Sequence, residues 1–329
     1  MQQWLTQWGQ GLTQSAQAAL AQAPGLVGLT HQQISSIAFG GMGGSGIAGR
    51  LVKLLIGARS SLPVTVIEGA RLPFLRDEHT LVVLSSYSGN TWEALEPFEQ
   101  CLARRLPMVV IASGGALLQR ARESGVPVLT VPTGWVPRAA LPLFLGTILG
   151  LLEYLGLYDG FPLVTEWAAH WREMQATVSD RRRYQTVCSL LSTATFCHVW
   201  GASDDSDAVA YRLQTQLNEN SKIAAVCSVL PELNHNLLVG FDAFETVITP
   251  VAPIVCLMTD FAPRLLSVSY ASVESTLAAR GILLYKPELF GDTWESQLAY
   301  ALWWADFASL YVGQARGCNI TQTRLIDAV

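Results

Sequence analysis

The sequence is poor in charged residues, and in lysine most of all. Only 14% of its 329 residues are charged, and the 21 basic residues comprise three lysines and eighteen arginines. The net charge is −5, and the one basic cluster, residues 181–183, lies in a polar connecting segment. Nucleic-acid-binding proteins usually carry a basic stripe. We therefore expect no nucleic-acid partner.

Clustered cysteine and histidine residues are also lacking. The six cysteines are widely spaced, and the sequence contains no C-x-x-C and no tight Cys/His group. Such spacing argues against both a zinc site and a disulfide framework. We expect no metal, no redox cofactor, and cysteines that serve as small buried hydrophobic residues in a reducing compartment.

Long hydrophobic runs are missing as well. The longest uncharged apolar run is about fourteen residues, from Ala139 to Leu152, and it contains Pro142. A helix needs about 20 apolar residues to cross a bilayer. The first lysine or arginine is Arg50, so the N-terminus lacks the charged region of a signal peptide. We expect a cytoplasmic protein without a membrane span.

In the first half of the chain, apolar runs typical of strands alternate with helical stretches. This alternation favours an α/β fold with a parallel sheet covered on both faces. Residues 1–30 have loosely spaced apolar positions among glutamines and predict a helical arm. We expect strands at 34–40, 63–69, 80–86, 107–113 and 127–132, and helices at 45–57, 90–105, 115–123 and from Pro137 to about Leu157.

The same alternation returns in the second half. Residues 158–190 are more polar and predict a helical connector, so we expect one domain over 1–157 and another over 191–329. In the second domain we expect strands at 196–201, 223–228, 252–260 and 282–287, and helices at 207–220, 232–240, 265–280 and 293–316.

Two polar turns follow the first and third expected strands. The first is glycine-rich and contains Gly43 and Ser45; the second contains Ser86, Ser88 and Thr91. Each turn leads into a helix, whose first N–H groups can bind an anion. Because parallel strands end at the same edge of a sheet, these hydroxyls could meet on one phosphate monoester.

Two other interpretations of these turns remain open. Gly41, Gly43 and Gly46 match G-x-G-x-x-G, and Glu68 follows about twenty residues later, which together form a dinucleotide-binding fingerprint. A dinucleotide site does not need the second set of hydroxyls. Alternatively, both turns could be ordinary turn and cap chemistry, with Asn90 and Glu93 capping the helix that begins there.

A polar stretch in the second half carries the candidate acid/base groups. Glu219 lies among asparagines in the segment QLNENSK, and His235 lies between Asn234 and Asn236, sixteen residues later. Glutamate and histidine are common proton-transfer groups. They form a plausible pair if the fold brings them to one cleft; otherwise they are a helix end and a hydrogen-bonded loop histidine.

Together the motifs resemble a known family. GMGGSG and SYSGNT resemble the sugar isomerase (SIS) domain, and with NENSK and ELNHN the chain resembles the bifunctional phosphoglucose/phosphomannose isomerases of archaea and bacteria. Each motif is weak by itself, but four in order at matching spacings are specific. The resemblance covers residues 30–329 and implies two SIS domains, each a flavodoxin-like three-layer sandwich, in a homodimer.

The resemblance also implies roles for particular residues. It implies that the sugar phosphate is bound by Gly43, Ser45, Ser86, Ser88 and Thr91. Glu219 matches the catalytic base that interconverts glucose or mannose 6-phosphate with fructose 6-phosphate through a cis-enediol. His235 matches a ring-opening histidine supplied by the neighbouring subunit, and Arg138 matches an arginine near the enediolate.

The C-terminal segment departs from the family pattern. Relatives tend to end in a D-P-x-x-V-x-x-I-D-x-L-K segment, whereas here Asn319-Ile320 replaces Asp-Pro, and no lysine follows Ile326-Asp327. Two alternatives are open: the lysine that assists ring opening is absent from this protein, or another group, such as Arg324 or Lys222, takes its place. A catalytically impaired, SIS-type sugar-phosphate-binding or regulatory protein is the alternative.

Overall fold

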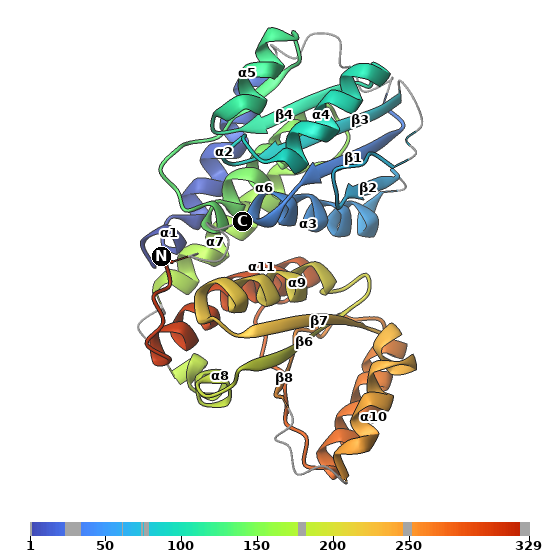
Figure 1. Cartoon of the computed structure of the whole chain (residues 1–329), viewed down its shortest axis with the longest axis vertical. Helices are drawn as coiled ribbons and strands as arrows, with labels where there is room; N and C mark the ends of the chain where they lie inside the picture. Colours follow the sequence, from blue (N-terminus) through green and yellow to red (C-terminus); the bar gives the residue numbers. More distant parts are fainter. Residues whose placement is uncertain are drawn as a thin grey trace. The chain divides into compact units, whose positions relative to one another are not determined.

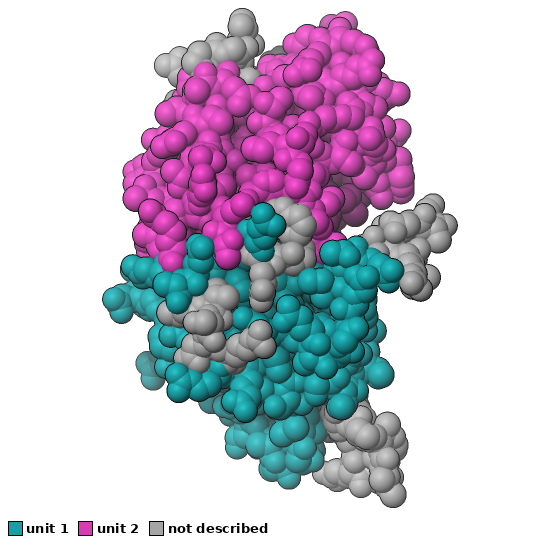
Figure 2. All heavy atoms as spheres, turned by 90° about the vertical axis from the view of Figure 1, so that its left-hand side faces the viewer, with its two compact units in different colours: residues 1–5, 173–329 teal, residues 6–172 magenta. Residues whose placement is uncertain are grey.

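The structure is a computed structural model, and it groups the chain into two compact units. One unit comprises residues 6–172, and the other comprises residues 1–5 together with 173–329 (Figure 2). We describe each unit by itself. The division lies within the segment predicted as a connector. The described residues are 2–23, 34–60, 62–73, 75, 79–176, 182–245 and 252–322, so Arg181 and the tail from Arg324 to Asp327 lie outside them.

The unit of residues 6–172 is built on a five-stranded parallel sheet in the order β2-β1-β3-β4-β5 (Figure 1). All five apolar runs predicted as strands form strands. The central strand β3 is buried along its whole length, as expected for a parallel sheet covered on both faces. The strands are β1 (Ser36–Gly41), β2 (Val64–Ile67), β3 (Thr80–Ser86), β4 (Met108–Ala112) and β5 (Val128–Thr130).

Helices cover both faces of this sheet. On one face, Phe98 and Cys101 of α4 and Leu117 of α5 pack on strand residues such as Val82 and Val110. On the other face lie α3 and α6, with α2 packed along α6 (Figure 1). The helices are α2 (Trp8–Gln22), α3 (Gly43–Arg59), α4 (Trp92–Arg104), α5 (Gly115–Glu123) and α6 (Leu141–Tyr154), and a 3₁₀ turn, η4 (Pro137–Ala139), precedes α6.

The uncharged run that ends at Leu152 is the buried helix α6. Two glycines four residues apart, Gly146 and Gly150, bring α2 close, because a Cβ at either position would strike the carbonyl oxygens of Leu12 and Ala16. Residues 141–152 of α6 are all buried, and a helix buried on all sides is apolar on all sides. In the part of the chain that the structure describes, no helix is both long and apolar enough to cross a membrane.

The other unit contains a four-stranded parallel sheet in the order β7-β6-β8-β9. Helix α10 covers one face together with the 3₁₀ segments, while α9 and α11 pack together on the other. The elements are α1 (Gln2–Leu5), α7 (Phe161–Ala176, which spans the division), α8 (Arg182–Leu191), β6 (Phe196–Ala202), α9 (Asp207–Gln216), β7 (Ala224–Leu230), β8 (Ile254–Cys256), α10 (Arg264–Ala279), β9 (Leu284–Tyr285) and α11 (Trp294–Ala315).

The α/β fold predicted from the sequence is confirmed, but three of the expected elements differ from the structure in extent or in type. The helix expected at 207–220 leaves the α-helical path after Gln216 and continues as a π turn, η5 (Leu217–Ser221). The helix expected at 232–240 is a pair of 3₁₀ segments, η6 (Glu232–His235) and η7 (Leu237–Glu245). The strand expected at 252–260 pairs only over β8. In the first two cases the short polar side chains bond to backbone or neighbouring groups and compete with helix geometry.

A buried ion pair joins α9 to α11. Arg212 donates from Nε and Nη2 to Asp306 at 3.0 and 2.7 Å, and both side chains are 1% exposed. Gln216 of α9 also donates to Asp306. Charges removed from water in this way are tolerated only when they are paired and hydrogen-bonded. The pair therefore fixes how α9 lies against α11.

We expect Asp306→Asn to lower the free energy of unfolding by about 3 kcal/mol or more, because the Arg212 charge stays buried without its partner. The measurement is urea denaturation followed by circular dichroism. As a control, Glu99→Gln removes a half-exposed ion pair with Arg120 and should change stability by less than about 1 kcal/mol. Equal losses in the two variants would contradict this account.

Candidate functional site

The strand order places a ligand-binding edge between β1 and β3. In sheets with the order 2-1-3-4-5, ligands bind at the carboxyl ends of strands 1 and 3, where the connections leave in opposite directions. Here Gly41 at the end of β1 pairs with Ser85 near the end of β3. The chain then leaves β1 into α3 and β3 into α4, on opposite faces of the sheet (Figure 1). The two polar turns predicted from the sequence therefore lie side by side.

A direct hydrogen bond joins these turns. The backbone N–H of Tyr87, which follows β3, donates to Ser45 Oγ at the start of α3 over 3.2 Å. Ser45 and Ser86 are 6% and 5% exposed, so both side chains are buried at this edge of the sheet. The structure thus brings together Ser45 and Ser86 from positions 41 residues apart.

The glycine-rich turn leaves room above it. Gly43 has φ +54°, a left-handed conformation that favours glycine, and an added Cβ there would meet no atom within 4 Å. No side chain caps the start of α3 or of α4. Since the first N–H groups of a helix lack partners within the helix, an open approach at Gly43 suits an anion.

The remaining hydroxyls shape the second turn. Ser86 Oγ accepts from Gly89 N at 3.1 Å, and Ser88 Oγ accepts from Asn90 N at 3.4 Å. The expectation that Asn90 caps α4 was wrong: its Oδ1 accepts from Ala116 N at 2.9 Å, at the start of α5. Thr91 precedes α4 but makes no side-chain cap bond. Ser88 and Thr91 are exposed at this edge.

Arg138 lies next to the glycine-rich turn. It is 6% exposed and belongs to η4, whose backbone touches Gly44: a Cβ on Gly44 would lie 2.6 Å from Pro137 O and 3.2 Å from Arg138 Cα. Gly44 is therefore required for this close approach. The structure brings the predicted arginine and the predicted phosphate-binding turn into contact within one unit.

The dinucleotide interpretation loses its support in the structure. The strand order is 2-1-3-4-5, not the 3-2-1-4-5-6 of the dinucleotide-binding fold. Glu68 forms an ion pair with Arg50 at 2.8 Å. Packing explains two of the three fingerprint glycines, because a Cβ at Gly41 would lie 2.7 Å from Ser85 O and one at Gly46 would strike Gly41 O.

Glu219 lies in the π turn η5, at the amino-terminal edge of the second sheet. Asn220 and Ser221, which follow it, are fully buried, whereas Glu219 itself is half-buried. Asn218 Oδ1 accepts from Ala225 N at 2.7 Å, and Lys222 Nζ donates to Glu219 O at 2.6 Å. π turns inserted in helices are frequent at functional sites.

His235 lies at the opposite end of the same strand from Glu219. Glu219 precedes β7, and His235 follows it in η6 with an exposed side chain. The seven residues of β7 span about 20 Å, at about 3.3 Å per residue. Within one chain, the fold therefore separates Glu219 from His235 instead of placing them in one cleft.

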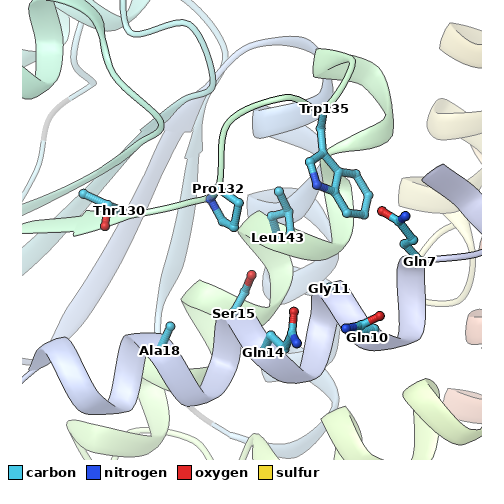
Figure 3. A pocket seen from close by; sticks show the side chains of 10 residues that line it. All are labelled: Gln7, Gln10, Gly11, Gln14, Ser15, Ala18, Thr130, Pro132, Trp135 and Leu143. Carbon is cyan, nitrogen blue, oxygen red and sulfur yellow. The ribbon is translucent and has the colours of Figure 1, made fainter. Parts of the chain in front are cut away.

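A hollow of about 340 Å³ lies beside the loop that follows β5 (Figure 3). Its lining includes Gln14 and Ser15 of α2, together with Pro132 and Trp135, and contains no ionisable side chain. The hollow is lined by amide, hydroxyl and apolar groups. Its wall is joined to the second turn by Tyr87, whose Oη donates to Pro132 O at 3.2 Å and accepts from Trp135 N at 2.8 Å.

Tyr87 is a residue of the candidate site that the sequence analysis missed. Its backbone N–H donates to Ser45 Oγ, and its phenol hydroxyl is hydrogen-bonded to Pro132 and Trp135 in the loop that follows β5. Burial raises the pKa of the Tyr87 phenol, an effect that the Trp135 N–H partly offsets, so the phenol keeps the proton that it donates to Pro132. The signal in the sequence was its position between the two serines of the turn.

Three of the six cysteines are poorly suited to act as nucleophiles. All six are free thiols, and burial raises the pKa of Cys101, Cys197 and Cys256 to about 12. A thiol of this kind stays protonated at neutral pH. Among the described residues, no three His, Cys, Asp or Glu side chains form a group that could hold a metal ion.

Comparison with known proteins agrees with these features. Residues 186–329 match the model of the bacterial phospho-glucose isomerase C-terminal SIS domain. The chain is 31% identical over 293 residues to the bifunctional phosphoglucose/phosphomannose isomerase of Pyrobaculum calidifontis, with 88% of this chain and 85% of that protein covered. The chain belongs to the bifunctional phosphoglucose/phosphomannose isomerase family.

Other similarities are shorter or more distant. The bifunctional phosphoglucose/phosphomannose isomerase of Caldicellulosiruptor bescii is 32% identical over 222 residues, which is 66% of each chain. The aligned part thus spans just under two thirds of that relative. The C-terminal domain of glucosamine-fructose-6-phosphate aminotransferase from Francisella tularensis has a TM-score of 0.71 at 17% identity, with 97% of both chains covered. That similarity concerns the fold alone.

The contact between Gly44 and η4 can be tested by a single methyl group. We expect Gly44→Ala to destabilise the protein by about 1 to 3 kcal/mol, because its Cβ would overlap Pro137 O. Thermal unfolding measures the effect. Gly57→Ala is the matched control on the same helix, since its Cβ meets no atom within 4 Å and helix propensity should stabilise it slightly. A Gly44→Ala variant as stable as Gly57→Ala would contradict the contact.

Proposed function

We propose that the protein interconverts glucose 6-phosphate, and also mannose 6-phosphate, with fructose 6-phosphate. The observation that carries this proposal is the pair of hydrogen-bonded, serine-lined turns at the β1/β3 edge of a chain that belongs to this isomerase family. The curated relatives named above are isomerases, which gives no support to the alternative of a regulatory protein.

The phosphate group is held without lysine. In this proposal Ser45, Ser86, Ser88 and Thr91 donate hydroxyl protons to it, and the backbone at Gly43 allows it to approach the start of α3. Binding the phosphate far from the reacting carbons fixes the position of the sugar chain, so its binding energy orients C1 and C2.

Glu219 moves the proton. Its carboxylate removes the proton from C2 of the open-chain aldose, which leaves a cis-enediolate. The hydroxyl proton then passes from O2 to O1 through the cis-enediol, and the protonated Glu219 returns its proton to C1 to give the ketose. The reaction is redox-neutral within the sugar, so it needs no external oxidant. As the enediol oxygens gain negative charge, the fixed guanidinium of Arg138 stabilises them. The half-buried setting of Glu219 fits a base that must be reached by substrate.

His235 serves ring opening, by transferring a proton between the ring oxygen and the C1 hydroxyl. Because β7 separates His235 from Glu219 by about 20 Å in one chain, the two cannot act on one hexose from the same subunit. This supports a homodimer in which each subunit lends His235 to its partner's site. A two-fold symmetric dimer would then contain two equivalent sites.

The base assignment predicts the behaviour of Glu219→Gln. This change keeps the shape and removes the proton acceptor, so kcat should fall by about 10²- to 10⁴-fold while fructose 6-phosphate still binds. Coupled assays and calorimetry measure the two quantities. Glu173→Gln, an exposed carboxylate in the same unit, should leave both unchanged. Wild-type turnover in Glu219→Gln would reject Glu219 as the base.

The exchange of His235 between subunits predicts complementation. Glu219→Gln and His235→Ala homodimers should each be impaired, whereas a purified hybrid dimer of the two should regain one intact site and about half of the wild-type rate. Co-expression with two different tags yields the hybrid. If His235 acts in its own subunit, both sites of the hybrid carry one defect, and the hybrid stays as inactive as its parents.

A further inference from the structure

We propose that helix α11 positions the catalytic turn, and that Ser309 is the residue through which it does so. This inference rests on the proposed function, because it concerns the base Glu219. Glu219 lies in η5 (Leu217–Ser221), a π turn that follows α9 and ends the helical segment with a hydrogen-bond pattern different from that of an α-helix. The direction of the Glu219 side chain therefore depends on what holds η5 from outside.

Ser309 binds both residues that follow Glu219. Asn220 Nδ2 donates to Ser309 Oγ at 3.0 Å, and Ser221 Oγ donates to Ser309 O at 2.6 Å. Ser309 Oγ in turn donates to Asp306 O at 2.7 Å. All three side chains are 0% exposed. Because no water can replace a lost partner at such a site, each of these bonds matters more than a surface hydrogen bond would.

Two further residues of α11 lie on the same face as Ser309. Gly313, one turn later, lets the turn approach closely, since a Cβ there would lie 2.5 Å from Asn220 O. Asp306, one turn earlier, binds Arg212 and Gln216 of α9, the helix that leads into η5. Residues at i, i+3 and i+7 share one face of a helix.

The two polar residues on this face, Asp306 and Ser309, are unusual for α11, most of which is buried and apolar. Burying a polar group is unfavourable unless it is hydrogen-bonded. Asp306 is hydrogen-bonded to α9 and Ser309 to η5, so α11 holds both the turn that contains Glu219 and the helix that leads into it. In this arrangement Ser309 touches no substrate and acts through Asn220 and Ser221; it is a positioning residue.

The test compares two serine-to-alanine variants on α11. Ser309→Ala removes the acceptor of Asn220. Ser296→Ala is the control. Ser296 is 2% exposed and forms the capping box with Thr293 at the start of the same helix, about 20 Å from Ser309 along the axis. Both changes remove one buried hydroxyl. The readouts are thermal unfolding, kcat and KM for fructose 6-phosphate, and the isotope effect on kcat with C2-deuterated glucose 6-phosphate.

The expected result distinguishes an effect on the position of Glu219 from an effect on the stability of the protein. Both variants should lose some thermal stability, but Ser309→Ala should also lose kcat by about 10- to 100-fold, because small displacements of a catalytic group are costly. Its KM should stay within about threefold of wild type, since the phosphate-binding turns belong to other elements. Its isotope effect should rise or stay at full size, because proton transfer becomes slower.

Three results would overturn the inference. One is a wild-type kcat in folded Ser309→Ala, and the second is an equal loss of kcat in Ser296→Ala. In both cases the wild-type protein is active, so the proposed function stands while Ser309 loses its role. The third is a wild-type protein that isomerises neither glucose nor mannose 6-phosphate. That result rejects the proposed function and with it the role of Ser309.

Discussion

The hydrogen bond from Tyr87 N to Ser45 Oγ is the interaction on which the candidate phosphate site depends. It can form because β1 and β3 are adjacent and in parallel register, so that Gly41 pairs with Ser85 and the two following turns begin at the same level. Glycine at positions 41, 44 and 46 lets the turns, the strand and η4 approach more closely than side chains would allow. The chemistry of the site thus follows from backbone packing.

In the other unit, a buried polar network has the corresponding role. Asp306 and Ser309 of α11 bind α9 and η5, which carries Glu219. A core made only of apolar residues would hold a turn with less directional precision, because hydrophobic contact has no preferred direction. The two units therefore hold the candidate site residues in different ways: by close backbone contact in one unit, and by buried hydrogen bonds in the other.

Predictions from the sequence were correct where they rested on neighbouring residues. Strands such as 80–86 were predicted within a residue or two, because fully apolar runs bounded by turn residues have few alternatives. The turns at Gly43 and Ser86 were recognised for the same reason. The prediction for Asn90 was wrong because its side chain can reach the starts of two helices, α4 and α5. The prediction for residues 217–220 was wrong because short polar side chains compete with α-helix geometry there.

By itself, the sequence determined the α/β class, the position of the polar turns and the family resemblance, because strand periodicity, glycine spacing and motif order are properties of neighbouring residues. Only the tertiary structure decided which turns meet, that Arg138 touches Gly44, and that Glu219 and His235 lie at opposite ends of β7. These facts depend on strand order and on contacts between residues far apart in the chain, which no local pattern encodes.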